Sequence, residues 1–125
     1  MKIEVSNGEL LDKLSIVEVK RVKIADASKV FFLDLEFDHL LENVNALGFE
    51  RLDDDLYVRL KEINFELWDI EDEIRLKEEH SEFDDRFIEL SRMIYIKNDE
   101  RARIKKELDI STESKFREQK GHKTV

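Results

Sequence analysis

A chain of 125 residues has the length of a single domain, and the absence of proline together with only three glycines excludes a sheet protein with frequent tight turns. Charged residues make up 42% and hydrophobic residues 41% of the chain, which indicates amphipathic helices and excludes a disordered chain. The net charge of −9 argues against binding to nucleic acid or to an anionic membrane, because both of these partners are negatively charged.

Two helices are predicted in the first half of the chain. Ser6 and Glu9 have the spacing of a capping box, so the first helix should run from there to about Ala25. Ser28 is the expected N-cap of the second helix, and Gly48 is its expected stop signal. The second helix carries apolar residues at spacings of three and four, which predicts a buried stripe of Val30, Leu33, Phe37, Leu40, Leu41, Val44 and Leu47.

The second helix is also apolar on its other sides. Phe31, Phe32, Leu33, Leu35 and Phe37 nearly encircle it, which is more surface than one neighbouring hairpin would cover. We therefore expect the chain to form a homodimer.

Two longer helices are predicted in the second half. The third begins at the three aspartates of residues 53–55, which suit a helix N-terminus. Its apolar stripe runs without a slip through Leu56, Leu60, Ile63, Leu67, Ile70 and Ile74. Ser81 or Asp84 should cap the fourth helix, whose stripe is Phe87, Leu90, Ile94 and Leu108.

The short connection near Ser81 makes the third and fourth helices antiparallel neighbours, with Asn64 level with Asn98. Residues 62–85 hold eleven Asp and Glu against two Lys and Arg, and the fourth helix is rich in complementary basic residues. The sequence therefore predicts an all-α fold, in which antiparallel helical hairpins form a four-helix arrangement with a long central hairpin at residues 54–109. We expect residues 1–109 to be one domain and residues 110–125 to be a loosely ordered basic tail.

Polar residues flank the apolar stripe of the third helix, among them Tyr57 and Lys61. Several should be partly buried, and buried polar groups must be paired. They form either a structural network that determines the register of the helices or a pocket for a polar ligand. The candidate residues are Asn64, Trp68, Glu71, Asp72, Arg75, Asn98, Asp99 and Arg101.

Two further motifs are incomplete as metal or catalytic sites. Glu36 and His39 form one Glu-x-x-His unit, whereas di-iron bundles use two. The acidic run at residues 69–73 includes Asp69, which forms a Glu-x-x-Asp with Glu66. Magnesium-dependent nucleotide hydrolases pair such a unit with a preceding Glu-x-x-Glu, and none precedes it here. We expect a surface histidine and a solvated acidic face, with no metal and no cofactor.

Other classes are made unlikely by what the sequence lacks. Without cysteine there are no disulfides, thiolate metal sites or cysteine nucleophiles. The first residues lack the apolar run of a signal peptide, and no stretch approaches the ~20 apolar residues of a membrane span. Glycine-rich phosphate loops and the common serine-hydrolase and zinc-protease motifs are also missing. The expected location is the cytoplasm.

Three stretches resemble a bacterial and phage family of uncharacterised small helical proteins. Residues 8–16 (GELLDKLSI) resemble the opening of that family, and residues 64–75 and 98–105 resemble its central motifs, N-x-x-L-W-x-x-E-D-x-x-R and N-D-x-R-x-x-x-K. The tail departs from the family, which tends towards Glu-Lys-Ser-Tyr where this chain has QKGH at residues 119–122. Some relatives lie near or are joined to glycosyltransferases, so the resemblance implies a link to glycan or surface-polysaccharide modification without assigning an activity.

The leading functional hypothesis is a non-enzymatic interaction or accessory module, with a second copy of the chain and a further protein as partners. The alternative is a small-ligand binder or a hydrolase that uses the polar face of the central hairpin.

Overall fold

The computed structural model describes residues 2–48 and 54–112. These residues form four α-helices and no strand: α1 (Asn7–Lys23), α2 (Ala27–Ala46), α3 (Asp55–Glu79) and α4 (Asp85–Thr112). The prediction of an all-α fold is confirmed. The predicted tail begins inside α4, which continues to Thr112, and its remaining residues, 113–125, lie outside the described part of the chain.

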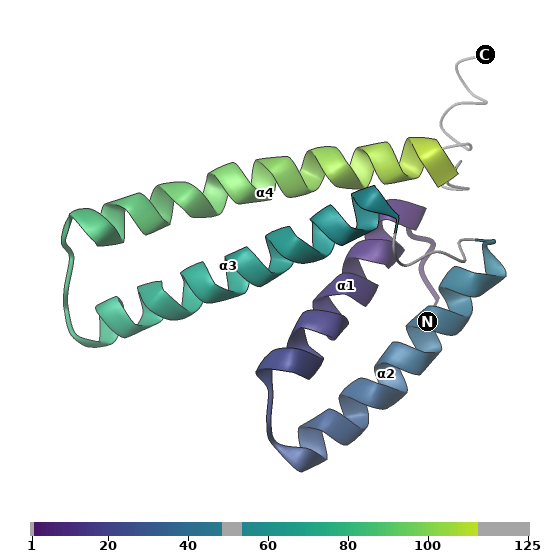
Figure 1. Cartoon of the computed structure of the whole chain (residues 1–125), viewed down its shortest axis with the longest axis horizontal. Helices are drawn as coiled ribbons and strands as arrows, with labels where there is room; N and C mark the ends of the chain where they lie inside the picture. Colours follow the sequence, from purple (N-terminus) through teal and green to yellow (C-terminus); the bar gives the residue numbers. More distant parts are fainter. Residues whose placement is uncertain (1, 49–53, 113–125) are drawn as a thin grey trace.

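The four helices are arranged as two hairpins that meet at one end and diverge from there (Figure 1). One hairpin consists of α1 and α2, and the longer one consists of α3 and α4. Among the described residues, α1 packs extensively against each of the other three helices, whereas α2 packs extensively only against α1. The first helix therefore joins the two hairpins.

The N-caps of the first two helices differ in how well the sequence predicted them. The Ser6 hydroxyl accepts a hydrogen bond from the Glu9 amide at 3.2 Å, as the capping box predicts. The predicted cap of α2, Ser28, is wrong. The Asp26 carboxylate caps this helix by accepting the amides of Ser28 and Lys29 at 3.0 and 3.3 Å, and the Ser28 hydroxyl donates to it. Ser28 is already the second residue of α2, so its amide and hydroxyl donate to the cap.

The caps of the second hairpin are aspartates. Asp54 accepts the amide of Leu56 at 3.0 Å, and Asp84 accepts the amide of Phe87 at 2.9 Å. Asp84 is thus the correct choice of the two candidate caps of α4. The other candidate, Ser81, lies in the connection with a left-handed φ of 53°.

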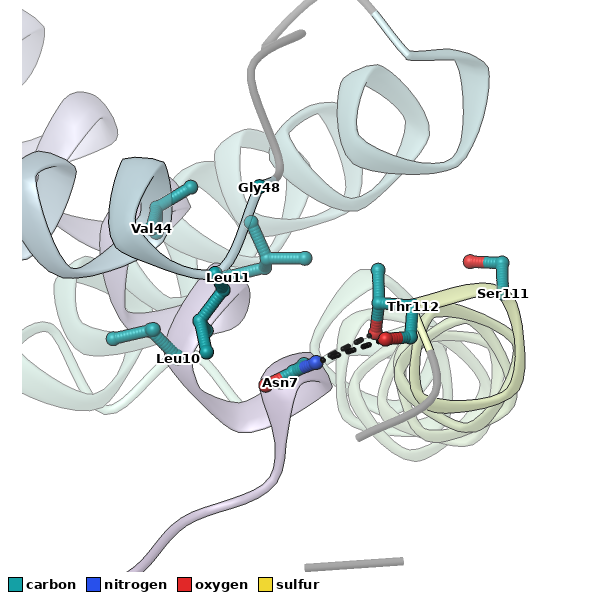
Figure 2. Close-up of a pocket in the computed structure, with 8 residues that line it drawn as sticks. Asn7, Leu10, Leu11, Val44, Gly48, Ser111 and Thr112 are labelled. Atoms are coloured by element: carbon teal, nitrogen blue, oxygen red, sulfur yellow. Dashed lines mark hydrogen bonds between the residues drawn. The ribbon is translucent and has the colours of Figure 1, made fainter. Parts of the chain in front are cut away.

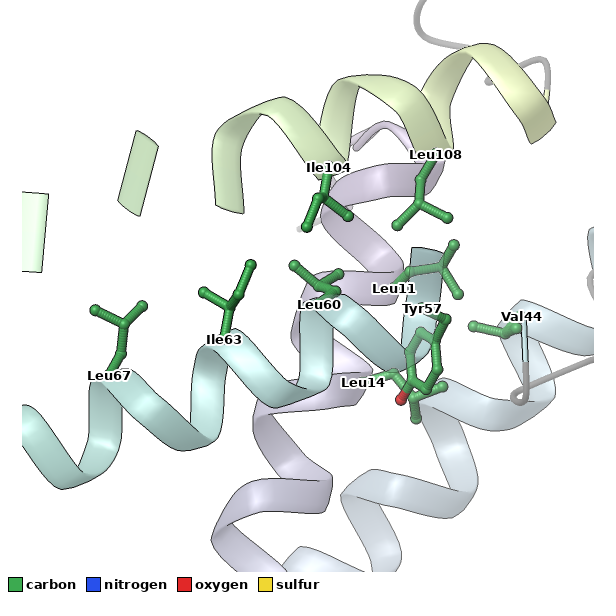
Figure 3. Packing of buried hydrophobic residues seen from close by; sticks show 9 residues of the cluster. All are labelled: Leu11, Leu14, Val44, Tyr57, Leu60, Ile63, Leu67, Ile104 and Leu108. Carbon is green, nitrogen blue, oxygen red and sulfur yellow. The ribbon is translucent and has the colours of Figure 1, made fainter. Parts of the chain in front are cut away.

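The core lies where the two hairpins meet (Figure 3). Leu11 and Leu14 of α1 point into it, and α2 contributes Val44. The buried members from α3 and α4 are Tyr57, Leu60, Ile63, Leu67, Ile104 and Leu108. On α4, helical spacing from Ile94 to Ile104 passes through Lys97 and Arg101, so the packing face of this helix becomes polar in its middle.

The predicted stripe of α2 is only partly buried. Leu33 and Val44 are buried, Val30, Phe37, Leu40 and Leu41 are partly buried, and Leu47 is 52% exposed. Because α2 packs extensively on one helix only, the middle of the stripe is buried and its two sides are only partly covered.

Ion pairs join α3 to α4 along their length. Glu66 binds Lys97 at 2.5 Å and Glu73 binds Arg86 at 2.8 Å, which agrees with the expected attraction between an acidic third helix and a basic fourth. Arg59 and Glu100 form a pair of the opposite polarity at 2.7 Å. Each such pair at a solvated surface contributes at most about 1 kcal/mol to the free energy of unfolding. These contacts therefore favour the pairing of α3 with α4 but add little to the stability of the fold.

Candidate functional site

Asp12 of α1 carries a buried carboxylate, which binds side chains of α3 and α4. The residue is 2% exposed. The Arg101 guanidinium donates to both of its oxygens, from Nε to Oδ1 at 2.9 Å and from a terminal nitrogen to Oδ2 at 2.5 Å. This bidentate geometry is the strongest pairing available to a carboxylate and an arginine, and it pairs the buried charge.

Asn64 of α3 completes the cluster. Its side-chain amide donates to Asp12 Oδ1 at 3.1 Å and to the Ser15 hydroxyl at 2.7 Å. The Ser15 hydroxyl in turn donates to the Asp12 carbonyl at 2.7 Å. Within the described residues no buried side-chain polar atom lacks a partner. We call these four residues, Asp12, Ser15, Asn64 and Arg101, the Asp12 cluster.

The cluster keeps Arg101 charged. The hydrogen bonds that Arg101 donates to Asp12 raise the pKa of its guanidinium, and partial burial opposes them more weakly. Lys105 adds a second positive charge, with its Nζ 3.9 Å from Asp12 Oδ2 and a closer contact to Glu9. The amino-terminal half of α1 is therefore bound to α4 by charge as well as by packing.

A cavity of about 310 Å³ adjoins the cluster. Its apolar wall consists of Ile16, Val19 and Leu67. The polar lining consists of Asn64, Trp68, Glu71, Asn98 and Arg101, and all five are candidate residues from the sequence. The structure thus places five of the eight candidates around one space.

The other three candidates lie elsewhere. Asp72, Arg75 and Asp99 are exposed and do not line the cavity. Glu71 and Asn98 are also exposed, although they line the cavity rim, while Trp68 and Arg101 are partly buried and Asn64 is buried. Of the polar residues that flank the stripe of the third helix, which were expected to be partly buried in several cases, Lys61 and Trp68 are partly buried and Tyr57 and Asn64 are buried.

The side chains of this lining differ in how they are paired. Asn64 and Arg101 belong to the Asp12 cluster, and Arg101 also donates to the side-chain carbonyl of Asn98 at 3.3 Å. Neither the indole N–H of Trp68 nor the Glu71 carboxylate makes a hydrogen bond or ion pair with another described residue. The cavity therefore presents a carboxylate without a hydrogen bond, attracted at longer range by Arg101, beside an aromatic ring and a paired arginine.

Sequence reasoning missed Asp12 and Ser15. It sought the partners of Asn64 on the neighbouring α4, whereas they come from α1, 52 and 49 residues away. A signal existed, because Gly8, Asp12 and Ser15 recur at spacings of four and three and share one face of α1. These small and polar residues form a second packing face beside the leucines.

A second polar contact joins α1 to α3. Tyr57 is fully buried, and its hydroxyl donates to the Glu18 carboxylate. Burial raises the pKa of Tyr57, and the hydrogen bond to Glu18 raises it further. Lys61 lies 3.9 Å from the same carboxylate, so the negative charge of Glu18 is partly matched.

A smaller cavity of about 230 Å³ lies where the helix ends meet (Figure 2). Asn7 projects into it and donates to the Thr112 hydroxyl at 3.0 Å and to the Thr112 carbonyl at 3.3 Å. Its other lining residues include Gly48, next to residues outside the described part of the chain. The contacts on its rim hold the start of α1 against the end of α4.

The residues considered for metal or hydrolytic chemistry are placed differently. His39 and Glu36 are exposed on α2, and within the described ranges no group of three or more potential metal-ligating side chains occurs. Glu66 pairs with Lys97 and Arg59, and Asp69 pairs with Lys23. In the part of the chain that the structure covers, no helix is long and apolar enough to cross a membrane.

Comparison with known proteins yields one family. A family model described as "Family of unknown function (DUF6165)" matches residues 1–125. No curated protein and no solved structure matches the chain. The match supplies a family but no activity.

Proposed function

The chain belongs to DUF6165, a family of unknown function, so the proposal has to come from the surface of the protein itself. We propose that the protein is a non-enzymatic interaction module that binds its partners through α2. The observation that supports this is the exposure of three large apolar side chains, Phe31, Phe32 and Leu35, at 60%, 68% and 53%. Large exposed apolar side chains that gather on one face are typical of protein-binding surfaces.

The three residues form one patch. By helical spacing they lie opposite the buried Leu33 and Val44, in the first turns of α2. Further along the same side of the helix the exposed residues are polar, namely Asp38, His39 and Glu42. We call Phe31, Phe32 and Leu35 the α2 patch.

The first partner that we propose is a second copy of the chain. Two α2 patches packed across a two-fold axis would bury the apolar side chains that α1 leaves uncovered. Such a homodimer would join two long α3–α4 hairpins into one assembly. The resemblance to proteins near glycosyltransferases supports a finer proposal, in which the dimer is a cytoplasmic accessory subunit of a glycan-modifying enzyme.

Sedimentation velocity over a range of concentrations tests the interaction. The full chain should sediment as a dimer, and Phe32→Glu should shift it to the 15.0 kDa monomer, because a buried unpaired charge opposes association. His39→Glu, which adds a carboxylate about two turns further along the same helix, is the matched control and should leave the dimer intact. A chain that stays monomeric at all concentrations contradicts self-association, and equal effects of the two variants contradict the role of the α2 patch.

The accessory role needs a second experiment. A glycosyltransferase encoded beside this chain should co-purify with the full-length protein and lose that association in the Phe32→Glu variant. Failure to recover the enzyme with the unmodified chain contradicts the accessory role and leaves the dimer to be judged by sedimentation.

A second candidate function is the binding of a small ligand in the cavity beside the Asp12 cluster. Five residues selected from the sequence line this cavity, and the unpaired Glu71 is available to a ligand. Hydrolysis is less favoured, because the Glu66 and Asp69 carboxylates are held in ion pairs.

A further inference from the structure

We propose that the cavity between α1, α3 and α4 binds a small organic cation, namely a primary ammonium group on a compact apolar body. This inference rests on the second candidate function and adds the chemical class of the ligand. It follows from the charges, the ring and the apolar wall that the cavity presents.

The charges of the lining favour a cation. Arg101 carries the positive charge, but both oxygens of Asp12 already bind it. Glu71 makes no hydrogen bond or ion pair with a described residue, and its attraction to Arg101 is weaker than those of Asp12 and Glu9, so its carboxylate is the least matched charge of the cavity. An ammonium group placed there gains a charge-assisted hydrogen bond without displacing an existing one.

An anionic ligand meets the opposite situation. To bind Arg101 it must compete with the bidentate Asp12 carboxylate, which is held within the protein. It would also approach the carboxylate of Glu71, which lines the cavity. Like charges at short range disfavour such a complex.

The remaining lining suits an apolar body with a cationic end. Ile16, Val19 and Leu67 offer aliphatic surface, and the Trp68 ring attracts a cation placed over its face. Asn98 lines the cavity, and its side-chain nitrogen makes no hydrogen bond with a described residue, since only its carbonyl oxygen is engaged by Arg101. The volume of about 310 Å³ lies at the lower end of the range of small-molecule sites.

Trp68 gives a direct measurement, because it is the only tryptophan of the chain. Its fluorescence is titrated at constant ionic strength with three probes that share one ring, namely cyclohexylmethylammonium, cyclohexylmethanol and cyclohexanecarboxylate. The ammonium probe should give a saturable change. The alcohol should bind about tenfold more weakly, because it lacks the charge-assisted bond to Glu71, and the carboxylate should show no saturable binding.

Two variants locate the interaction. Glu71→Gln should lower the affinity for the ammonium probe about tenfold. Asp72→Asn removes the same charge from the next residue, which is exposed and does not line the cavity, and should change the affinity by no more than about twofold. Both side chains are exposed and make no hydrogen bond or ion pair with a described residue, so thermal unfolding of the two variants should match that of the parent chain.

The outcomes separate the ligand class from the site. Equal affinity for the alcohol and the ammonium supports binding in the cavity but overturns the cationic class, and stronger binding of the carboxylate overturns it as well. No saturable change with any of the three probes overturns the ligand-binding function itself. Equal effects of the two variants overturn the assignment to Glu71.

Discussion

Replacing Asp12 with alanine removes the carboxylate that joins α1 to α3 and α4. The side chain is 3% exposed and binds Arg101 through both oxygens. After the substitution the Arg101 side chain, 26% exposed, keeps its hydrogen bond to Asn98 and the longer-range attraction of Glu9 and Glu71. Asn64 keeps its bond to Ser15 and loses the one to Asp12.

The expected cost follows from these contacts. Removing one partner of a buried ion pair costs about 3–5 kcal/mol of the free energy of unfolding, because the other charge is left unpaired. Arg101 is about a quarter exposed and so regains some hydration, which places Asp12→Ala near the lower end, at about 3 kcal/mol. Arg101→Ala leaves the more deeply buried carboxylate unpaired and should cost about as much or more.

Urea unfolding followed by circular dichroism at 222 nm measures these changes in a double-mutant cycle. The double variant should be destabilised by at least about 2 kcal/mol less than the sum of the single variants, because the second substitution removes the stranded charge. If Asp12→Ala costs under about 1 kcal/mol with an unchanged urea dependence, the pair behaves as a surface ion pair and the cluster is not buried as described.

Two further changes test other contacts. In Gly8→Ala, the added Cβ would collide with the Lys105 carbonyl oxygen of α4, and we expect a loss of about 1–3 kcal/mol in urea unfolding; an unchanged stability would mean that α1 and α4 do not approach so closely. Burial and Glu18 raise the pKa of Tyr57 in the folded state, so its contribution is intact below the unfolded value of about 10 and is lost as the pH rises above it. Urea midpoints should therefore fall less steeply above about pH 10 in Tyr57→Phe than in the parent, and identical slopes would contradict the shift.

The sequence predicted the helices well because their signals are local. The stripe of α3 keeps spacings of three and four from Leu56 to Ile74, and an α-helix places residues at such spacings on one face. The caps at Ser6 and Asp84 lie within a few residues of the amides that they accept. The error at Ser28 is also local, since Asp26 accepts the amides of Ser28 and Lys29 and the helix therefore begins two residues earlier than predicted.

The candidate site could be predicted only in part, because its contacts are distant in sequence. Asn64 and Arg101 stand out on their own helices as polar residues at packing positions. Nothing in the periodicity of α3 or α4 specifies that α1 packs across both of them and supplies the Asp12 carboxylate. The same gap explains the exposure of α2, whose apolar stripe predicts burial without stating how many neighbours cover it.

The bond between Asp12 and Arg101 has a consequence for the way the protein is made. The two residues are separated by 89 positions, and at about 5–20 residues per second a ribosome needs on the order of ten seconds to add Arg101 after Asp12. Arg101 is missing during the whole of that interval, and Asn64 is missing during most of it. The Asp12 carboxylate therefore lies on a packing face of α1 without either partner for most of the time. The α1–α2 hairpin therefore leaves the ribosome without its binding surface, and its apolar residues are available to chaperones until the last turns of α4 have been synthesised.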